Sequence, residues 1–313
     1  MCPSIWSQRH STLIKSADQQ HRRLIAGVIG GLAFGPVNIS HYNLNVFQDC
    51  KHGANMQSSA LLRVLHKLVE KEGHLPEEWT IGADNTTKET KCNTTMWFFI
   101  WLLCVLDGAS LWQITVLFLL VGHTHNELDR FFSRLSVALR GRDYFTVPGM
   151  FAAAQHAIRS CQFDCGHLGQ IWDWDSQKQQ PWFHEMTGLP RVHAIRFSRG
   201  DGIFVQWKHW MTDEGWCKPI QVVPREMMET VGAFRPQCVK MEFPVQVGMH
   251  DFVTMLQSWC ETPEHGFQGY QQEFQWLHDA INHQAPDFDP GQEVDGLLQD
   301  LRAMSRKGAP YRA

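Results

Sequence analysis

The sequence predicts an α/β fold, a mixed sheet flanked by helices, with a smaller β-rich unit towards the C-terminus. Three observations support this prediction. Residues 79–121 contain in turn a strand pattern, an apolar helix and an apolar strand, the order typical of a parallel pair with a right-handed crossover. Two further strand patterns precede this segment. After about residue 160 tryptophans become frequent and a hairpin pattern appears, which indicates the β-rich unit.

The first predicted elements are two strands, RLIAGVIGGLAF at 23–34 and HYNLNVFQ at 41–48, joined by a Gly-Pro turn and paired antiparallel. A helix over about 56–72 follows, because leucine and valine recur there at the spacing of one buried helical face. Asn55 is a residue type that caps a helix N-terminus, and Gly73 is a type that ends a helix. All three elements belong to the predicted α/β domain.

The next predicted elements are a short strand, WTIGAD at 79–84, a helix over about 93–106, and a continuous apolar strand, ITVLFLLV at 114–121. The two apolar segments are each far shorter than the roughly 20 residues that a membrane-spanning helix needs, and Asp107-Gly108 separates them. We therefore expect buried core elements and no membrane association.

A further helix is expected directly after the second apolar strand. Thr124 and Glu127 fit the S/T-x-x-E capping box that begins a helix. Apolar residues continue this helix at core-facing spacing from Leu128 to Leu139. The N-terminal half therefore contains two antiparallel strands followed by parallel ones in one mixed sheet.

The later part of the chain contains a hairpin, VHAIRFSRGDGIFVQWKHW at 192–210, which turns at Asp201-Gly202. Trp207, Trp210 and Trp216 could stack on nucleic-acid bases, although core and hairpin packing explains them more simply. The predicted division of the chain is a poorly defined N-terminal segment, an α/β domain, a β-rich accessory unit and a helical, loosely ordered tail, over residues 1–22, 23–160, 165–245 and 246–313 respectively.

Composition limits the classes of function. The 313 residues are 43% hydrophobic and 19% charged, as in a globular protein of about two domains. The net charge of −4 excludes an overall basic surface, so any nucleic-acid contact would come from a local patch. Nine cysteines without regular spacing, and an N-terminus without an apolar signal core, predict an intracellular location with reduced thiols.

Polar side chains follow the two predicted parallel strands where each strand ends. Asp84 ends the first strand, His123 and His125 follow the second, and Asp129 lies one helical turn beyond His125. Because functional groups gather at the carboxyl ends of parallel strands, we expect these four side chains at one sheet edge. Clustered carboxylates suit Mg²⁺ or Mn²⁺, and imidazoles shift the preference toward Mn, Fe or Zn.

A second interpretation of these residues needs no metal. Thr124 and Glu127 would cap a helix, His125 and Asp129 would form a surface pair, and Asp84 would be a turn residue. The spacing alone leaves both interpretations open.

Two motifs bear a resemblance to a known family. ADNTTKETK at 83–91 and LVGHTHNELDRFFSRLS at 120–136 resemble a domain-of-unknown-function family of transposon-derived proteins, whose members are similar to ribonuclease-H-like integrases and transposases. The family pattern is roughly D-N-x-x-x-E-x-K-N, an apolar helix, a strand, and then G-H-T-H-x-x-x-D-x-x-F-S. HGANMQSSALLRVL at 52–65 is similar to the family's preceding helix. The resemblance covers about residues 23–142 and implies a ribonuclease-H-like mixed sheet.

The resemblance also implies catalytic roles. Asp84 would end the fourth strand of the sheet and bind metal there, and Asp129 would supply the later acid on the helix after the fifth strand. His123 would be a further metal ligand, and His125 would line the same pocket as a ligand or proton-transfer group. The implied cofactor is Mg²⁺ or Mn²⁺.

Three basic residues are predicted to contact phosphates. Lys91 stands at the start of the helix between the two motifs, and Arg130 and Arg134 share one face of the later helix. A solvated helix face is the alternative interpretation of the two arginines.

The sequence departs from the family pattern in two places. Cys92 stands where the family has Asn. The first-strand acid of a ribonuclease-H site should precede residue 23 by a substantial segment, yet Asp18 is the one acid in that region. The α/β domain is therefore expected to lack its first strand, and either the chain is truncated or the site has lost a ligand.

Three functions follow from these observations. The first is a transposon-derived ribonuclease-H-like domain, ancestrally a metal-dependent DNA nuclease or strand-transfer enzyme, with DNA as its partner and the nucleus as its compartment. The second is a catalytically inactive domesticated module that binds nucleic acid or protein. The third is a non-nuclease metal hydrolase that uses His123, His125 and an aspartate, which zinc dependence would distinguish.

Overall fold

The computed structural model divides into two compact units, and each is considered by itself. The first unit comprises residues 1–51, 125–170 and 240–291, and the second comprises residues 52–124, 171–239 and 292–313. The structure describes residues 26–34, 39–47, 53–83, 90–118, 163–167, 171–210, 212–239 and 294–305, together with residues 133, 134, 136, 137, 254, 258 and 275. No helix in this described part is long and apolar enough to cross a membrane.

The described sheet of the first unit has three strands. β1 (Ala26–Phe34) pairs antiparallel with β2 (Ile39–Phe47), and β2 pairs in parallel with β5 (Phe163–His167). The two strands predicted over 23–34 and 41–48, and their antiparallel pairing, are confirmed. The Gly-Pro turn predicted between them lies outside the described residues.

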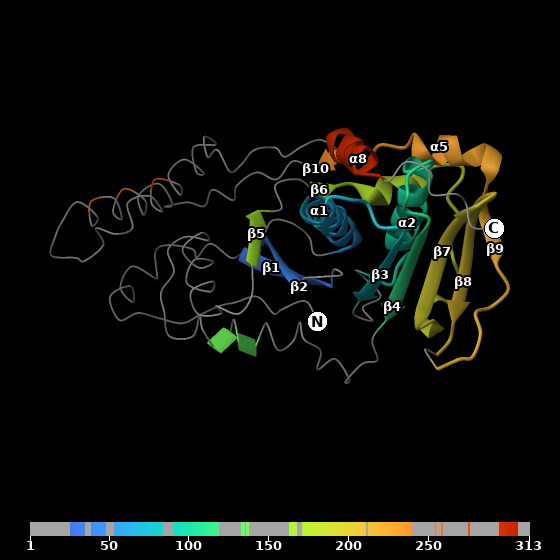
Figure 1. The fold of residues 1–313 in the computed structure, drawn as a ribbon, viewed down its shortest axis with the longest axis horizontal. Helices are drawn as coiled ribbons and strands as arrows, with labels where there is room; N and C mark the ends of the chain where they lie inside the picture. Colours follow the sequence, from blue (N-terminus) through green and yellow to red (C-terminus); the bar gives the residue numbers. More distant parts are fainter. Residues whose placement is uncertain are drawn as a thin grey trace. The chain divides into compact units, whose positions relative to one another are not determined.

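The second unit is built on a mixed five-stranded sheet (Figure 1) in the order β3-β4-β7-β8-β9. β3 (Glu78–Ala83) and β4 (Gln113–Phe118) are parallel, and the next three strands are antiparallel to their neighbours. These three are β7 (Ala194–Gly200), β8 (Gly202–Lys208) and β9 (Ile220–Pro224). The prediction of a mixed α/β sheet flanked by helices is confirmed.

The grouping of the strands differs from the prediction in one respect. β1 and β2 belong to the first unit, so the single mixed sheet that would join them to β3 and β4 stays a prediction. The sequence predicts β7 and β8 within a separate β-rich unit over 165–245. β7 instead hydrogen-bonds to β4, and β8 to β7, so both extend the sheet of β3 and β4. The reason is that β4 has a second open edge, and the chain returns to fill it after residue 190.

Shorter elements and two long helices complete the second unit. The long helices are α1 (Ala54–Glu72) and α2 (Asn93–Val105), and a third helix, α8 (Val294–Ala303), lies near the C-terminus. The shorter elements are β6 (Ile171–Trp172), η1 (Trp174–Gln179), η2 (Leu189–Arg191), η3 (Arg225–Met227), α5 (Met228–Gly232) and β10 (Cys238–Val239).

α2 connects β3 to β4 and is buried along nearly its whole length. Every residue from Thr94 to Val105 is buried, because α2 packs against β7 and β8 and also against α1, α5 and η1. A helix that is apolar all round is stable only where protein covers every side. The helix predicted over 93–106 is therefore confirmed, as are buried positions in place of a membrane span.

The C-terminal end of α1 agrees with the sequence prediction, and its N-terminal end does not. Gly73 ends the helix in the left-handed conformation with φ 72°, as predicted. The N-cap is Gly53, so the prediction that Asn55 caps this helix is wrong. The Asn55 amide instead donates to Asp173 Oδ1 at 3.1 Å and accepts from the Asp175 backbone N–H at 2.9 Å. A long-range contact thus uses the side chain that local capping would have used.

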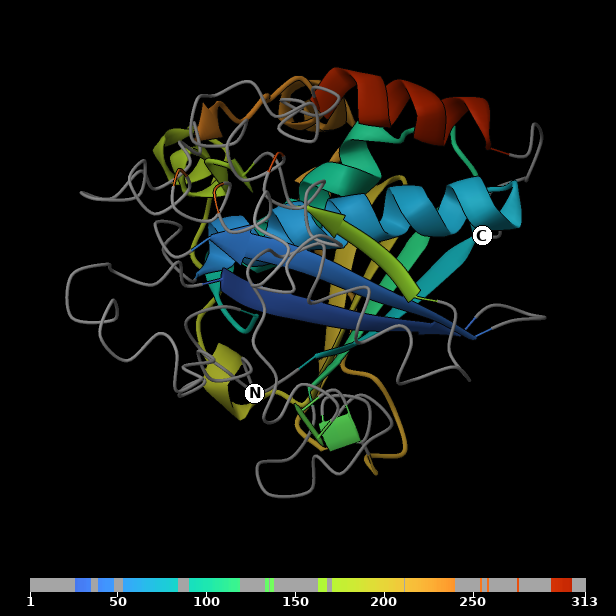
Figure 2. The same cartoon turned by 90° about the vertical axis from the view of Figure 1, so that its left-hand side faces the viewer.

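α8 packs beside α1, as Figure 2 shows with α8 in red and α1 in blue. Its apolar face is buried, with Leu297, Leu298 and Leu301 fully covered. His66 Nε2 of α1 lies 3.0 Å from Asp300 Oδ2 of α8. This part of the tail predicted as helical and loosely ordered is therefore helical and firmly packed.

The hairpin between β7 and β8 turns at Asp201 and Gly202, as predicted. Gly202 has φ 116°, which L side chains rarely adopt. A Cβ atom there would lie 2.5 Å from the Val223 carbonyl oxygen. Glycine is therefore required both by the backbone conformation and by the closeness of β9.

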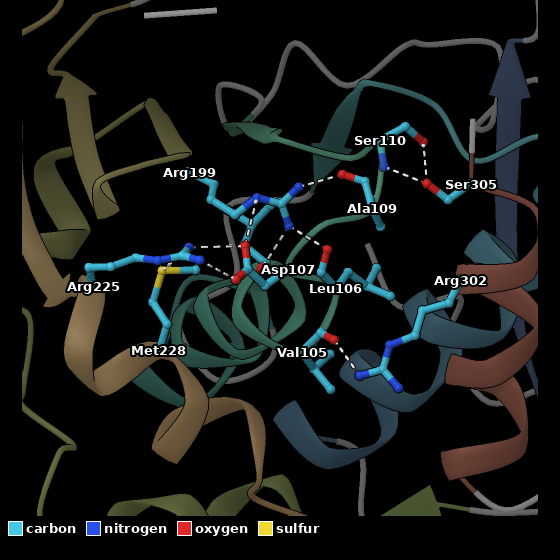
Figure 3. A network of polar contacts seen from close by, with 11 residues as sticks. Val105, Leu106, Asp107, Ala109, Ser110, Arg199, Arg225, Met228, Arg302 and Ser305 are labelled. Atoms are coloured by element: carbon cyan, nitrogen blue, oxygen red, sulfur yellow. Dashed lines mark hydrogen bonds and ion pairs between the residues drawn. The ribbon is translucent and has the colours of Figure 1, made fainter. Parts of the chain in front are cut away.

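A buried arginine closes the carboxyl end of α2 (Figure 3). The Arg199 guanidinium donates hydrogen bonds to the carbonyl oxygens of Leu103, Leu106 and Ala109. The last carbonyls of a helix lack partners within it, and a cation there also complements the helix dipole. Arg302 of α8 donates to the Val105 carbonyl at 2.6 Å in the same way. Side chains from β7 and α8 thus hold the end of the crossover helix.

Candidate functional site

The candidate site lies at the carboxyl ends of β3 and β4. The two strands pair in parallel register from Glu78 with Gln113 to Ala83 with Phe118, so they end side by side. Asp84 is the next residue in the chain after Ala83, and the segment that contains both histidines begins just after Phe118. The expectation that the two strands are parallel neighbours with a common carboxyl edge is confirmed.

The predicted site residues themselves are mostly outside the described part of the chain. Those outside it are Asp84, His123, His125, Asp129 and Arg130. Their gathering into one site therefore stays a prediction. Among the residues that the structure does describe, no group of three or more histidine, cysteine, aspartate or glutamate side chains could hold a metal ion.

Lys91 is described, and it lies at this edge of the sheet. Its residue is 2% exposed, its ammonium donates to the Pro190 carbonyl at 3.0 Å, and it lies 4.9 Å from the centre of the Phe118 ring. Burial lowers the pKa of Lys91 below its usual range. These contacts anchor the start of α2 to the end of β4, so Lys91 has a structural role there whether or not it meets a phosphate.

Arg134 is described as an exposed helical residue of the first unit. Its exposure suits either a phosphate contact or a solvated helix face. Its predicted phosphate contact stays a prediction.

The same edge continues across β7 and β8. Phe118 N–H donates to the His193 carbonyl at 2.8 Å, and His193 N–H donates to the Lys208 carbonyl at 3.0 Å. The start of β7 and the end of β8 therefore lie in line with the ends of β3 and β4. The ends of β3, β4 and β8 and the start of β7 share this edge of the second unit.

An aromatic pair occupies the β7–β8 part of the edge. The His193 and Trp210 rings are stacked with centroids 4.8 Å apart and an interplanar angle of 12°. His193 is 9% exposed and Trp210 is 55% exposed. His193 Nδ1 is buried and has no hydrogen-bond partner among the described residues. The pair therefore presents one indole face to solvent above a covered imidazole.

Sequence reasoning did not identify this pair. The hairpin pattern predicts both residues on neighbouring strands, whereas His193 directly precedes β7 and Trp210 follows the end of β8. The pattern carries no sign that His193 lies beside the end of β4. Trp210 was explained by core and hairpin packing, which its exposure contradicts. The adjacent His209 and Trp210, directly after the predicted hairpin strand, are the sequence signal that could have indicated it.

A cavity of about 500 Å³ lies at the opposite end of α2, away from this edge. Its charged lining residues include Asp107, Arg225 and Arg302. Arg225 forms an ion pair with Asp107 at 2.8 Å, and Arg302 donates to the Val105 carbonyl. Because these charges already have protein partners, the cavity is better explained as part of the closure of α2 than as a binding site.

Cys104 in the wall of this cavity allows a prediction about pH. Burial, and then the nearby Asp107 carboxylate, raise the pKa of the Cys104 thiol from 9.0 to about 12. Above pH 9 the native thiol stays protonated while the unfolded chain loses its proton, so stability falls as pH rises. We expect the free energy of unfolding of the wild type, minus that of Cys104→Ala, to fall by about 1.4 kcal/mol per pH unit between pH 9 and 12. Denaturant unfolding across this range measures it, and a constant difference would contradict the prediction.

One comparison with known proteins gives a match. A family model for a domain of unknown function, DUF7869, matches residues 16–213. No curated protein and no solved structure matches the chain significantly. The matched range includes both predicted motifs, at 83–91 and 120–136, and also His193 and Trp210.

Proposed function

The chain belongs to the DUF7869 family of domains of unknown function, and we propose that it is a transposon-derived, ribonuclease-H-like domain. The ancestral reaction in this proposal is metal-dependent cleavage or strand transfer of DNA phosphodiesters. Asp84, Asp129, His123 and His125 are the proposed catalytic residues. The proposal gives a chemical reason for the acids and histidines of the two motifs at 83–91 and 120–136.

The observation that supports this proposal most directly is the parallel pair of β3 and β4. The register of Ala83 with Phe118 brings the two strand ends to one edge, and a buried crossover helix joins them. Such an edge is where open α/β sheets carry their functional groups. Asp84 follows one of these ends directly, as a metal-binding acid at the end of a strand must.

The chemistry of the donor set fits a hard divalent cation. Asp84 and Asp129 supply carboxylate oxygens, the ligands that Mg²⁺ and Mn²⁺ prefer, and His123 supplies an imidazole that Mn²⁺ also accepts. When bound, such a cation would activate a water molecule and stabilise the leaving oxygen of the phosphodiester.

The chain's own residues would prepare the site for this chemistry. Asp84 and Asp129 would hold the metal by charge and orient the phosphodiester against it. His125 would hold or release a proton near neutral pH, the range in which an unperturbed imidazole titrates. Lys91 would act indirectly, since its contacts with Pro190 and Phe118 hold the start of α2 at the end of β4.

Metal binding is the property to measure first. We expect the wild-type chain to bind Mn²⁺ in a calorimetric titration, and Asp84→Asn and Asp129→Asn each to abolish that binding. Asp201→Asn is the matched control, because Asp201 is an exposed acid at the opposite end of the same sheet. This control should bind Mn²⁺ like the wild type.

Three outcomes would contradict the proposal. These are the absence of Mn²⁺ binding, binding that both aspartate variants retain, and binding of Zn²⁺ without Mn²⁺. The last outcome would favour a zinc hydrolase that uses the two histidines.

A second candidate function is a module that binds nucleic acid or protein without catalysis. The contacts of Lys91 favour it, because a buried ammonium committed to a carbonyl oxygen and an aromatic ring is poorly placed to meet a phosphate. DNA binding by a chain that binds no Mn²⁺ would support this function over the first.

A further inference from the structure

We propose that Trp210 is a stacking platform for an unpaired nucleic-acid base at the edge formed by the ends of β3, β4 and β8. This inference rests on the proposed function, which brings a nucleic acid to that edge. It names the form of the substrate that the site would favour, a single strand or an unpaired end.

The geometry of the aromatic pair supports this role. Trp210 lies nearly parallel on His193, with an interplanar angle of 12° and 4.8 Å between ring centroids. One face of the indole is thus covered, while the residue as a whole remains 55% exposed. A base needs one open aromatic face of this kind, because every base can stack through its own π-face.

The backbone of Trp210 is held in a closed turn. Its N–H donates to Asp213 Oδ2 at 2.9 Å, and its carbonyl accepts from the Asp213 N–H at 3.1 Å. The Lys208 ammonium donates to the Asp213 carbonyl at 2.6 Å and closes the turn from the other side. A platform fixed in advance loses little conformational freedom when a ligand stacks on it.

His193 provides a second and independent observation. Its Nδ1 is buried without a hydrogen-bond partner in the part of the chain that the structure describes. Such an atom carries a free-energy cost that an apolar residue would avoid. The imidazole nevertheless lies flat beneath the indole, where its ring holds the orientation of Trp210. A polar ring at this buried position is explained by its support of the platform better than by packing.

The surroundings favour a nucleic acid over a protein partner. In the part of the chain that the structure describes, the large exposed apolar residues are Trp210, Ile220 and Val137. A stable protein interface buries on the order of 1,000 Å² or more, which one exposed ring cannot supply. The Asp213 carboxylate is engaged by the Trp210 N–H, and the Lys208 ammonium donates to the Asp213 carbonyl in the same turn.

The platform lies on the same sheet edge as the end of β3, the strand that Asp84 follows in the chain. Ala83, Phe118 and His193 are neighbours across β3, β4 and the start of β7, and His193 pairs next to the end of β8. Three strand spacings separate the ends of β3 and β8, or roughly 15 Å. A short single-stranded segment can span that distance, so a base on Trp210 would position the phosphodiester further along its strand.

The test is binding of a labelled oligothymidylate by fluorescence anisotropy, in EDTA so that metal plays no part. We expect the Kd of Trp210→Ala to be roughly tenfold higher than that of the wild type, the loss of affinity expected when one base–aromatic stack is removed. Trp210→Phe keeps a ring and should bind within about twofold of the wild type. Ile220→Ala is the matched control, since it removes 50%-exposed apolar surface from the same sheet.

The salt dependence and the form of the DNA sharpen this test. The effect of Trp210→Ala should persist at high salt, because stacking, unlike phosphate contact, releases no counterions. It should be absent for a duplex of the same sequence, in which the bases are already stacked. Three outcomes would overturn the proposal. Trp210→Ala could bind the single strand as tightly as the wild type, it could lose as much affinity for the duplex as for the single strand, or the wild type could fail to bind the single strand.

The result can be separated from that of the metal titration. Trp210-dependent binding of single strands, without any Mn²⁺ binding, would support the platform and contradict the catalytic proposal. Mn²⁺ binding that depends on Asp84, without any effect of Trp210→Ala, would support the catalytic proposal and contradict the platform.

Discussion

Replacing Arg199 by methionine is expected to lower the free energy of unfolding by about 3–5 kcal/mol. Arg199 is 6% exposed, and its guanidinium donates to three carbonyl oxygens at the end of α2. Its loss would take this donor from the Leu103 and Ala109 carbonyls and would remove the cation that offsets the helix dipole, while the Leu106 carbonyl would keep its bond from the Ala109 N–H. Asp107, whose carboxylate lies 3.8 Å from Arg199 Nε, would lose part of its charge compensation as well.

Arg225→Met is the matched control for this change. Arg225 forms an ion pair with the same carboxylate of Asp107, but its side chain is 48% exposed. Exposed ion pairs contribute less than about 1 kcal/mol, so this variant should unfold close to the wild type. Denaturant unfolding followed by circular dichroism compares the two. If the two variants lower the free energy of unfolding equally, the burial of Arg199 does not decide how much it stabilises the fold.

Replacing Trp174 by alanine is expected to have an effect of similar size, about 3–5 kcal/mol. The Trp174 ring is fully buried and meets the rings of Phe98 and Trp101 edge-on, each at 4.8 Å between centroids. Its indole N–H donates to Ser59 Oγ at 3.1 Å. The variant would leave a cavity between α1 and α2, and it would remove one hydrogen bond of Ser59.

Trp174→Phe separates the two contributions. It keeps most of the buried ring and loses the hydrogen bond to Ser59, so we expect a cost of about 1–2 kcal/mol. Trp210→Ala is the control for tryptophan removal as such, and its cost should be less than about 1 kcal/mol because the residue is exposed. If Trp174→Ala and Trp210→Ala lower the free energy of unfolding equally, the contacts of Trp174 with Phe98 and Trp101 do not stabilise the second unit.

The local elements could be predicted from the sequence because their signals are local. α2 is apolar on every side, β4 is a short apolar run, and glycine, the residue at position 73, is the type that most often ends a helix. The turn at Gly202 likewise follows from two adjacent residues. In each case the pattern depends on residues within a few positions of one another, and burial later confirms it.

The strand neighbours could not be predicted in the same way. β4 pairs with β7 through residues about 80 positions apart, and nothing in either strand specifies the other. The prediction of the α1 cap is wrong for the same reason, since the Asn55 side chain hydrogen-bonds to Asp173 rather than to its own helix. Hydrogen bonds of this kind depend on which edges remain open once the core has packed.

The same distinction between local and long-range signals applies to the candidate site. The sequence by itself determined that Asp84 directly follows a strand, that a second apolar strand precedes His123, and that a buried helix joins the two. The tertiary structure alone decided that these strands end side by side, that Lys91 is buried against Phe118, and that His193 lies under Trp210. The physical reason is that periodicity and turn chemistry act within a few residues, whereas strand pairing and ring stacking depend on how distant segments share one core.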